Sequence, residues 1–188
     1  YPEHMEGYEG IFNDAKSKSW NLGVFRIKES GKIFIFATTH LWWKKSPVDE
    51  TSFGNNVYQA GSDEAREHQI AIVAEKIRFY REKYACPAVL VGDLNTNYRS
   101  KAISYLLANG FHHAHNIATE YVDESIGYHD CFGWGYVTEY YNGPFEDAID
   151  HILLLGEKES SVKRFERYSP DYYFPISDHS PAFIDVEF

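Results

Sequence analysis

The chain has 188 residues, of which 44% are hydrophobic and 17% aromatic, and its formal net charge is −10 at pH 7. This length and apolar content suffice for one well-packed globular domain and exclude a disordered, fibrous or repeat architecture. The negative charge disfavours non-specific binding of nucleic acid. Two cysteines, Cys86 and Cys131, neither build a disulfide framework nor match a paired zinc-ligand spacing.

Membrane and targeting signals are absent from the sequence as written. No apolar run reaches the roughly 20 residues that a membrane-spanning helix needs, so we expect a soluble protein. The chain begins at Tyr1 without an initiator Met. The compartment stays undetermined, and a secreted or periplasmic location fits if a leader has been removed.

The first regular structure expected along the chain is a β-hairpin. After a polar, irregular stretch at residues 1–18, two β-rich runs flank Ser30 and Gly31, which is typical turn chemistry. The second run, at residues 33–39, is apolar on both faces and is typical of an interior strand. That strand would deliver His40 to its end.

Residues 62–84 are predicted to form an amphipathic helix laid on a sheet. Ser62 is a plausible N-cap because acidic residues follow it in the first turn. Apolar residues then recur at helical spacing: Ile70, Val73, Ile77 and Tyr80. Continued backward, this stripe reaches Gln69 and Arg66. Either the start of the helix approaches a site, or its first turns are solvated.

The rest of the chain alternates between predicted strands and one more helix. Pro87 begins a buried strand that runs to residue 93, and Ser100 is expected to cap a helix that Gly110 stops. Residues 111–146 are predicted to hold loops and short β segments. Three further strands are expected at 147–156, 161–168 and 182–188. Several strands with two covering helices indicate an α+β layered sandwich.

Polar residues interrupt the buried strands at three places. His40 ends one strand, Asp93 and Asn95 end another, and Asp150 lies within an apolar run. A buried carboxylate is costly unless it is paired or hydrogen-bonded, so Asp150 needs a partner. The best candidate is His179, because a carboxylate holds one imidazole tautomer and raises its basicity. Such a dyad could activate water.

The residue before that histidine adds a metal hypothesis. Asp178 offers a hard oxygen ligand, which suits Mg²⁺ or Mn²⁺ better than zinc, and His40 could then donate to a phosphate oxygen. Taken singly, each feature also has a structural interpretation. A strand-end histidine is often a core or surface residue, and the stretch 92–95 could be an Asx-type turn. The ordered set is harder to obtain by chance.

As a set, these residues resemble a known superfamily. The stretches are TTHL (38–41), GDLN (92–95), IDHI (149–152) and SDHSP (177–181), with Arg66 and Gln69 between the first two. They resemble the endonuclease/exonuclease/phosphatase superfamily, the DNase-I-like proteins. The resemblance implies a four-layered αββα sandwich that cleaves phosphoester bonds with magnesium. Residues 1–188 would be a single domain covering roughly the C-terminal two thirds of the family fold.

The resemblance also implies roles for individual residues. His179, oriented by Asp150, would be the general base, Asp93 and Asn95 would position water and phosphate, and His40 would stabilise phosphoryl charge. Asp178 would hold Mg²⁺ or Mn²⁺. We expect contacts to substrate from three further residues: Arg66, Trp42 and Lys44. For the adjacent tryptophans, an equally good interpretation is that they cover the core.

One part of the family pattern is not found. It includes a strand with an Asn and a strand with the principal metal-binding Glu, both upstream of the hairpin. Asn21 lies in the strand that leads into the hairpin, so we interpret it as structural. We therefore expect that the N-terminal strands are missing and that a further segment or a second chain completes the fold. The other expected partner is a phosphate-ester substrate of undetermined class.

Three rival interpretations remain. A calcineurin-like dimetal phosphoesterase would need an Asp-x-His before Gly-Asp and a Gly-Asn-His after it, and neither occurs. The histidines at 112, 113 and 115 could suggest a transition-metal site, but a solvated loop without acidic companions is the preferred interpretation. A catalytically silent family member acting as a binding module is the alternative from a different functional class.

Overall fold

The computed structural model describes residues 18–44, 58–122, 148–156, 161–167, 179 and 181–188. Eleven elements lie in these ranges: β1 (Trp20–Arg26), β2 (Ile33–Thr39), α1 (Ser62–Tyr84), β3 (Ala88–Asp93), α2 (Lys101–Ala108), β4 (Phe111–His113), α3 (Ala114–Ile117), β5 (Glu120–Val122), β6 (Asp150–Leu155), β7 (Ser161–Arg167) and β8 (Ala182–Glu187). The predicted hairpin, both long helices and the later strands are therefore confirmed.

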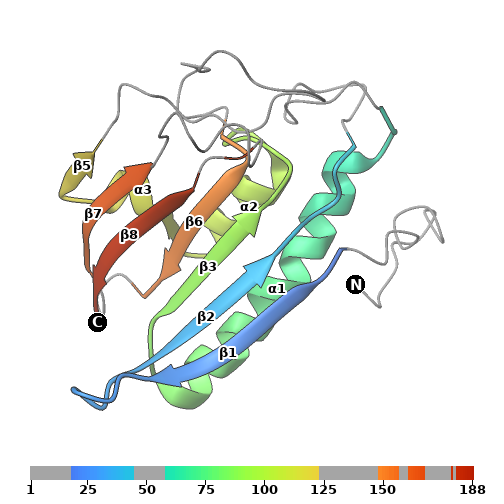
Figure 1. The fold of residues 1–188 in the computed structure, drawn as a ribbon. Coiled ribbons are helices and arrows are strands. Elements are labelled where there is room, and N and C mark those ends of the chain that lie inside the picture. The colour runs from blue at the N-terminus through green and yellow to red at the C-terminus, as the bar shows by residue number, and fades with distance from the viewer. Residues whose placement is uncertain (1–17, 45–57, 123–147, 157–160, 168–178, 180) are drawn as a thin grey trace.

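A five-stranded sheet forms the centre of the described structure, in the order β1-β2-β3-β6-β4. Strands β1 and β2 are the antiparallel hairpin, with Trp20 opposite Thr39 and Arg26 opposite Ile33. Strand β3 runs parallel to β2, and β6 runs antiparallel to β3. Strands β2 and β3 therefore end at the same edge of the sheet where β6 begins, as Figure 1 shows.

Helices α1 and α2 cover one face of this sheet (Figure 1). The apolar stripe of α1 packs against the inward residues of β2 and β3, including Ile35 and Leu90, and these side chains are fully buried. Apolar surface removed from water contributes roughly 25 cal/mol per Å², so this contact stabilises the described structure. No described helix has the length and apolar character that crossing a membrane requires.

The two helix starts differ in how they are capped. Ser100 caps α2 as predicted, because its hydroxyl accepts a hydrogen bond from the backbone N–H of Ile103 at 3.2 Å. The N-cap predicted at Ser62 is wrong. The cap of α1 is Gly61, in the left-handed conformation with φ 79°, and the Ser62 hydroxyl instead donates to the carbonyl oxygen of Gln59 at 2.7 Å. Local sequence favoured serine, whereas the left-handed turn required glycine.

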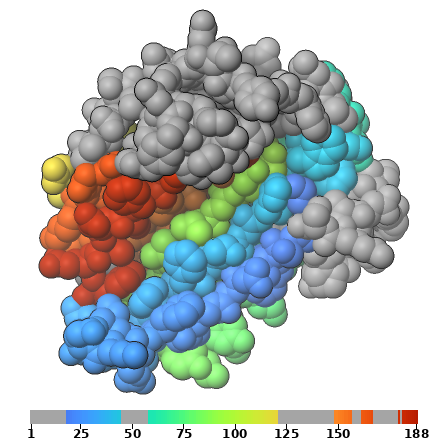
Figure 2. Space-filling model, in the orientation of Figure 1, coloured from blue at the N-terminus to red at the C-terminus, as the bar shows by residue number. Residues whose placement is uncertain are grey.

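A three-stranded sheet, β5-β7-β8, packs near the other face of β3 and β6. Its contact forms a separate apolar cluster that includes Val89, Leu154 and Phe165. Val89 lies in this cluster whereas Leu90 lies under the helices, because successive strand residues point to opposite faces. Figure 2 shows β3, β2 and β1 side by side on one face of the molecule, with the C-terminal strands in orange and red beyond β3.

Candidate active site

The sheet topology brings together the polar residues that interrupt its strands. His40 follows the last residue of β2, Asp93 ends β3, and Asp150 begins β6. Asp93 and Asp150 are register partners across the β3–β6 ladder. One oxygen of each carboxylate and a ring nitrogen of His179 all lie within 4.8 Å of one another.

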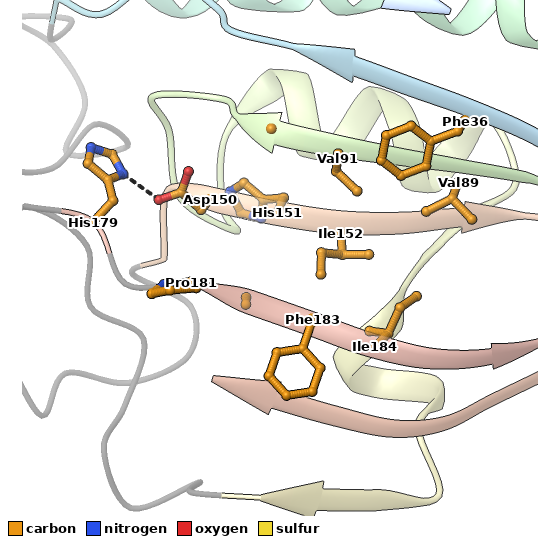
Figure 3. A pocket seen from close by; sticks show the side chains of 12 residues that line it. Phe36, Val89, Val91, Asp150, His151, Ile152, His179, Pro181, Phe183 and Ile184 are labelled. Carbon is orange, nitrogen blue, oxygen red and sulfur yellow. Dashed lines mark hydrogen bonds and ion pairs between the residues drawn. The ribbon is translucent and has the colours of Figure 1, made fainter. Parts of the chain in front are cut away.

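His179 and Asp150 form the tightest contact at this edge. The Nδ1 atom of His179 lies 2.5 Å from Oδ2 of Asp150, as drawn in Figure 3. Because an ionised carboxylate only accepts, Nδ1 carries the hydrogen and Nε2 is the acceptor nitrogen of the neutral ring. The two side chains are 30% and 25% exposed, so the pair is reachable from solvent. In this geometry the His179 imidazole can accept a proton from a water molecule.

A second imidazole–carboxylate pair lies beside the first. Nε2 of His40 is 3.3 Å from Oδ2 of Asp93 and 2.5 Å from Nζ of Lys18. Sequence reasoning missed Lys18, which lies in the stretch interpreted as irregular. Burial lowers the pKa of Lys18 to about 8, although the charge of Asp93 opposes this shift. Its ammonium therefore gives up its proton at a lower pH than the ammonium of an ordinary lysine.

Opposing effects act on the Asp93 carboxyl. Burial by itself would raise its pKa, but the hydrogen bond with His40, the charges of His40 and His179, and the N–H of Asn95 outweigh burial and leave the pKa below its ordinary value. The carboxyl is therefore ionised at neutral pH. An ionised carboxylate facing two imidazoles is suited to holding a cation or orienting a donor.

The GDLN stretch is shaped by close backbone contacts. A Cβ atom at Gly92 would collide with the carbonyl oxygen of Thr39, so only glycine lets β3 approach β2 at this edge. Asn95 has a left-handed backbone with φ 52°, and its N–H donates to Oδ1 of Asp93 at 2.8 Å. Its side-chain amide donates to the carbonyl oxygen of Leu41 at 3.2 Å. The stretch is an Asx-type turn that also fixes the Asp93 carboxylate.

Arg66 lies deeper than its predicted substrate role requires. Its side chain is fully buried, and Nη1 donates to the carbonyl oxygens of Trp42 at 3.3 Å and Lys44 at 2.7 Å. Gln69 accepts a hydrogen bond from the backbone N–H of Trp42 at 3.0 Å. The interpretation of a solvated helix start is therefore wrong. The first turns of α1 hold the segment that follows His40, and the buried side chain of Arg66 is part of this support.

The two other residues predicted to bind substrate lie in the segment that Arg66 holds. Trp42 is only 3% exposed, so its ring belongs to the core. Nζ of Lys44 lies over the rings of Trp42 and Trp43, at 5.4 and 5.8 Å from their centroids. Lys44 and Trp43 are half-buried and are the parts of this segment that a ligand can reach.

An apolar cavity of about 460 Å³ opens beside the dyad. Its walls come from facing strands of the two sheets, including Phe36, Val91 and Phe183, and Figure 3 shows Asp150 and His179 at one end. The low polarity of this wall strengthens electrostatic interactions at the dyad relative to open water.

Two predicted features need separate comment. Asp178, the predicted metal ligand, lies outside the described residues. The preferred interpretation of a solvated loop at the three histidines is wrong, because His112 and His113 are in β4 and His115 is in α3. His113 is 3% exposed and stacks on Tyr98 with ring centroids 4.1 Å apart. Burial, together with His151 and His115, lowers the pKa of His113 well below its ordinary value.

Sequence comparison assigns the chain to a family. The profile described as the endonuclease/exonuclease/phosphatase family matches residues 13–179. The chain belongs to the endonuclease/exonuclease/phosphatase family. The resemblance inferred from the four motifs is thereby confirmed. No curated protein matches the chain significantly.

Solved structures share the fold of this family member. A mannosyl-6-phosphatase from Bacteroides thetaiotaomicron is similar with a TM-score of 0.64 and 20% identity, over 91% of this chain and 57% of that one. The human Nocturnin catalytic domain with a bound sulfate anion has a TM-score of 0.62 and 16% identity, over 91% and 53%. Truncated TDP2 from Caenorhabditis elegans has a TM-score of 0.57 and 18% identity, over 93% and 61%.

These similarities bear on fold. They confirm the α+β sandwich of the DNase-I-like type that the sequence predicted. The chain spans 53–61% of the length of these three structures. That residues 1–188 are a single domain corresponding to the C-terminal part of the family fold stays a prediction.

Proposed function

We propose that this protein is a metal-dependent phosphoesterase in which Asp150 and His179 activate water for attack on a phosphate ester. The observation that carries the proposal is the 2.5 Å contact between these side chains, at the sheet edge where Asp93 faces Asp150 across the ladder. The names of similar proteins support the reaction class, since one is a mannosyl-6-phosphatase and another carries a bound sulfate, an anion of phosphate-like shape.

The base is His179. With Nδ1–H donated to Asp150, Nε2 takes a proton from water as the oxygen approaches phosphorus. Asp150 stabilises the imidazolium that results, and the proton passes on to solvent or to the departing oxygen. A positioned base of this kind accounts for a rate factor on the order of 10² to 10⁴.

The neighbouring carboxylate fits a divalent cation. The donor set of Asp93, Asp150 and His179 contains two hard oxygen ligands within 4.8 Å of an imidazole nitrogen, which suits Mg²⁺ or Mn²⁺. We propose that Asp93 and Asp178 hold the ion and that Asp150 stays with His179. When bound, such an ion neutralises charge on the phosphoryl oxygens.

The remaining predicted site residues hold or face the reacting groups without taking part in the proton transfer. Asn95 keeps the Asp93 carboxylate and the Leu41 carbonyl in place, and His40 faces the reacting group with a side chain that is 48% exposed. Arg66 and Trp42 support the segment after His40 from within the core. In this segment, Lys44 is the predicted substrate contact.

Hydrolysis of bis-p-nitrophenyl phosphate during a magnesium titration tests the proposal. We expect turnover that requires Mg²⁺ or Mn²⁺, is lost with a chelator and falls in the His179→Ala variant. The matched control is His112→Gln, which changes a histidine of β4 that lies outside the proposed site. Absence of metal-dependent turnover in the folded protein would favour the alternative of a silent binding module.

A further inference from the structure

Lys18 is held beside the active-site edge by the same hydrogen bonds that build the hairpin. The antiparallel register places Trp20 opposite Thr39. The contact with β2 continues before the start of β1, because the carbonyl oxygen of Ser19 accepts from the N–H of His40 and from the Thr39 hydroxyl, both at 3.2 Å. The position of Lys18 next to His40 is therefore set by the backbone of the sheet.

The lysine side chain is directed at the exposed imidazole of His40. The residue is 8% exposed, and its Nζ lies 2.5 Å from Nε2 of His40, whose own side chain is 48% exposed. Burying an ammonium costs free energy, so a lysine in this place must be stabilised by a nearby negative charge or hydrogen-bond acceptor. Asp93 provides part of this stabilisation, since its carboxylate lies 3.3 Å from the same imidazole nitrogen.

A role as counter-ion of Asp93 alone does not account for the direction of the side chain. The amine nitrogen meets the imidazole nitrogen, so Lys18 places a basic group beside His40 on the β1–β2 side of Asp93. His179 lies on the β6 side. Phosphoryl transfer spreads negative charge over three equatorial oxygens, which favours cationic groups on more than one side of the phosphate.

We propose that Lys18 and His40 form an anion subsite that holds a non-bridging oxygen of the phosphate group, on the side of Asp93 away from the dyad. The inference rests on the proposed function, because it assigns the dyad side to the attacking water. The ligand is defined by its chemistry as a tetrahedral, negatively charged phosphate group with at least two non-bridging oxygens. Lys18 donates from its ammonium, and His40 orients that ammonium toward the ligand.

Equilibrium binding of inorganic phosphate at saturating Mg²⁺, measured by calorimetry, tests the subsite. We expect Lys18→Met to weaken phosphate binding about tenfold to a hundredfold, the range for losing one charge-assisted hydrogen bond. Lys18→Arg keeps a cation and should bind within a few-fold of wild type. Lys101→Met is the matched control, because Lys101 pairs with Glu64 on exposed surface. Phosphate binding by Lys18→Met within about twofold of the control would overturn the subsite.

A second measurement needs no variant and protects the test against misfolding of Lys18→Met. In wild-type protein, addition of phosphate should shift the imidazole resonances of His40. Shifts at His179 with none at His40, or no phosphate binding at all, would also overturn the subsite. Both readouts are binding equilibria. A loss of the proposed catalytic role, seen as turnover that does not depend on His179, would therefore be distinguishable from a loss of this subsite.

Discussion

The two imidazole–carboxylate pairs at the sheet edge have the same chemistry and different surroundings. His179 and Asp150 are 2.5 Å apart, use Nδ1 and open into an apolar cavity. His40 and Asp93 are 3.3 Å apart, use Nε2 and share that nitrogen with the ammonium of Lys18. In the first pair, Nε2 is the ring nitrogen that does not meet the carboxylate, whereas in the second pair Nε2 meets both the carboxylate and the ammonium. We propose that this difference divides the work, with the first pair moving the proton and the second pair binding the charge of the phosphate.

The largest effect should come from breaking the first pair. Replacing His179 or Asp150 with Ala should lower metal-dependent turnover by a factor on the order of 10² or more, with little change in fold. Steady-state kinetics on bis-p-nitrophenyl phosphate and circular dichroism would check this. If both variants keep wild-type rates, the pair is structural.

Changing the carboxylate of the second pair should have a somewhat smaller effect on activity, and the effect should appear in the magnesium dependence of turnover. Asp93→Asn keeps the shape of the GDLN turn and removes the charge that faces the two imidazoles. We expect the magnesium concentration for half-maximal turnover to rise by roughly tenfold to a hundredfold. If the variant keeps the magnesium dependence and the turnover of wild type, the GDLN stretch is a structural turn without a role in metal binding.

Removing the buried support of the second pair should affect stability. Arg66→Met deletes the donors to the carbonyl oxygens of Trp42 and Lys44 inside the core. We expect a loss of about 2 kcal/mol in the free energy of unfolding, because buried acceptors lose their partner. Urea unfolding measures it, with Lys76→Met on the exposed side of α1 as the control. Equal stability of both variants would contradict the supporting role.

The smallest effect concerns the acid stability that His113 of β4 contributes to. The pKa of His113 is lowered in the folded protein, so below the ordinary histidine value near 6.5 the unfolded chain binds one more proton than the native state. Stability should therefore fall as pH drops, by at most about 1.4 kcal/mol per pH unit from this residue. His113→Phe keeps a ring against Tyr98 and should remove that part of the slope. An unchanged slope would contradict the assignment.

Much of the fold and part of the site could be predicted because the signals are local. Apolar runs bounded by glycine and proline indicated the strands of the central sheet, and polar residues at their ends pointed to His40, Asp93 and Asp150. Parallel β2 and β3 end at one edge, so residues that follow them meet there. These inferences needed no knowledge of distant contacts.

The features that could not be predicted depend on contacts between distant segments. Lys18 reaches the site only because pairing with β2 extends past the first strand. The burial of Arg66 follows from the return of the segment after His40 over the start of α1. His113 is buried because β4 pairs with β6 and brings its ring close to His151. Sequence patterns around each residue carry no sign of these neighbours.

The central claim is that the two pairs form one phosphate and metal site, and paramagnetic Mn²⁺ tests it most directly. At low occupancy of Mn²⁺, the imidazole resonances of His40 and His179 should broaden together, while those of Phe25, near the far end of β1, should not. Asp93→Asn should weaken both effects in parallel. Broadening of one histidine without the other, or of neither, would contradict a single site at this edge of the sheet.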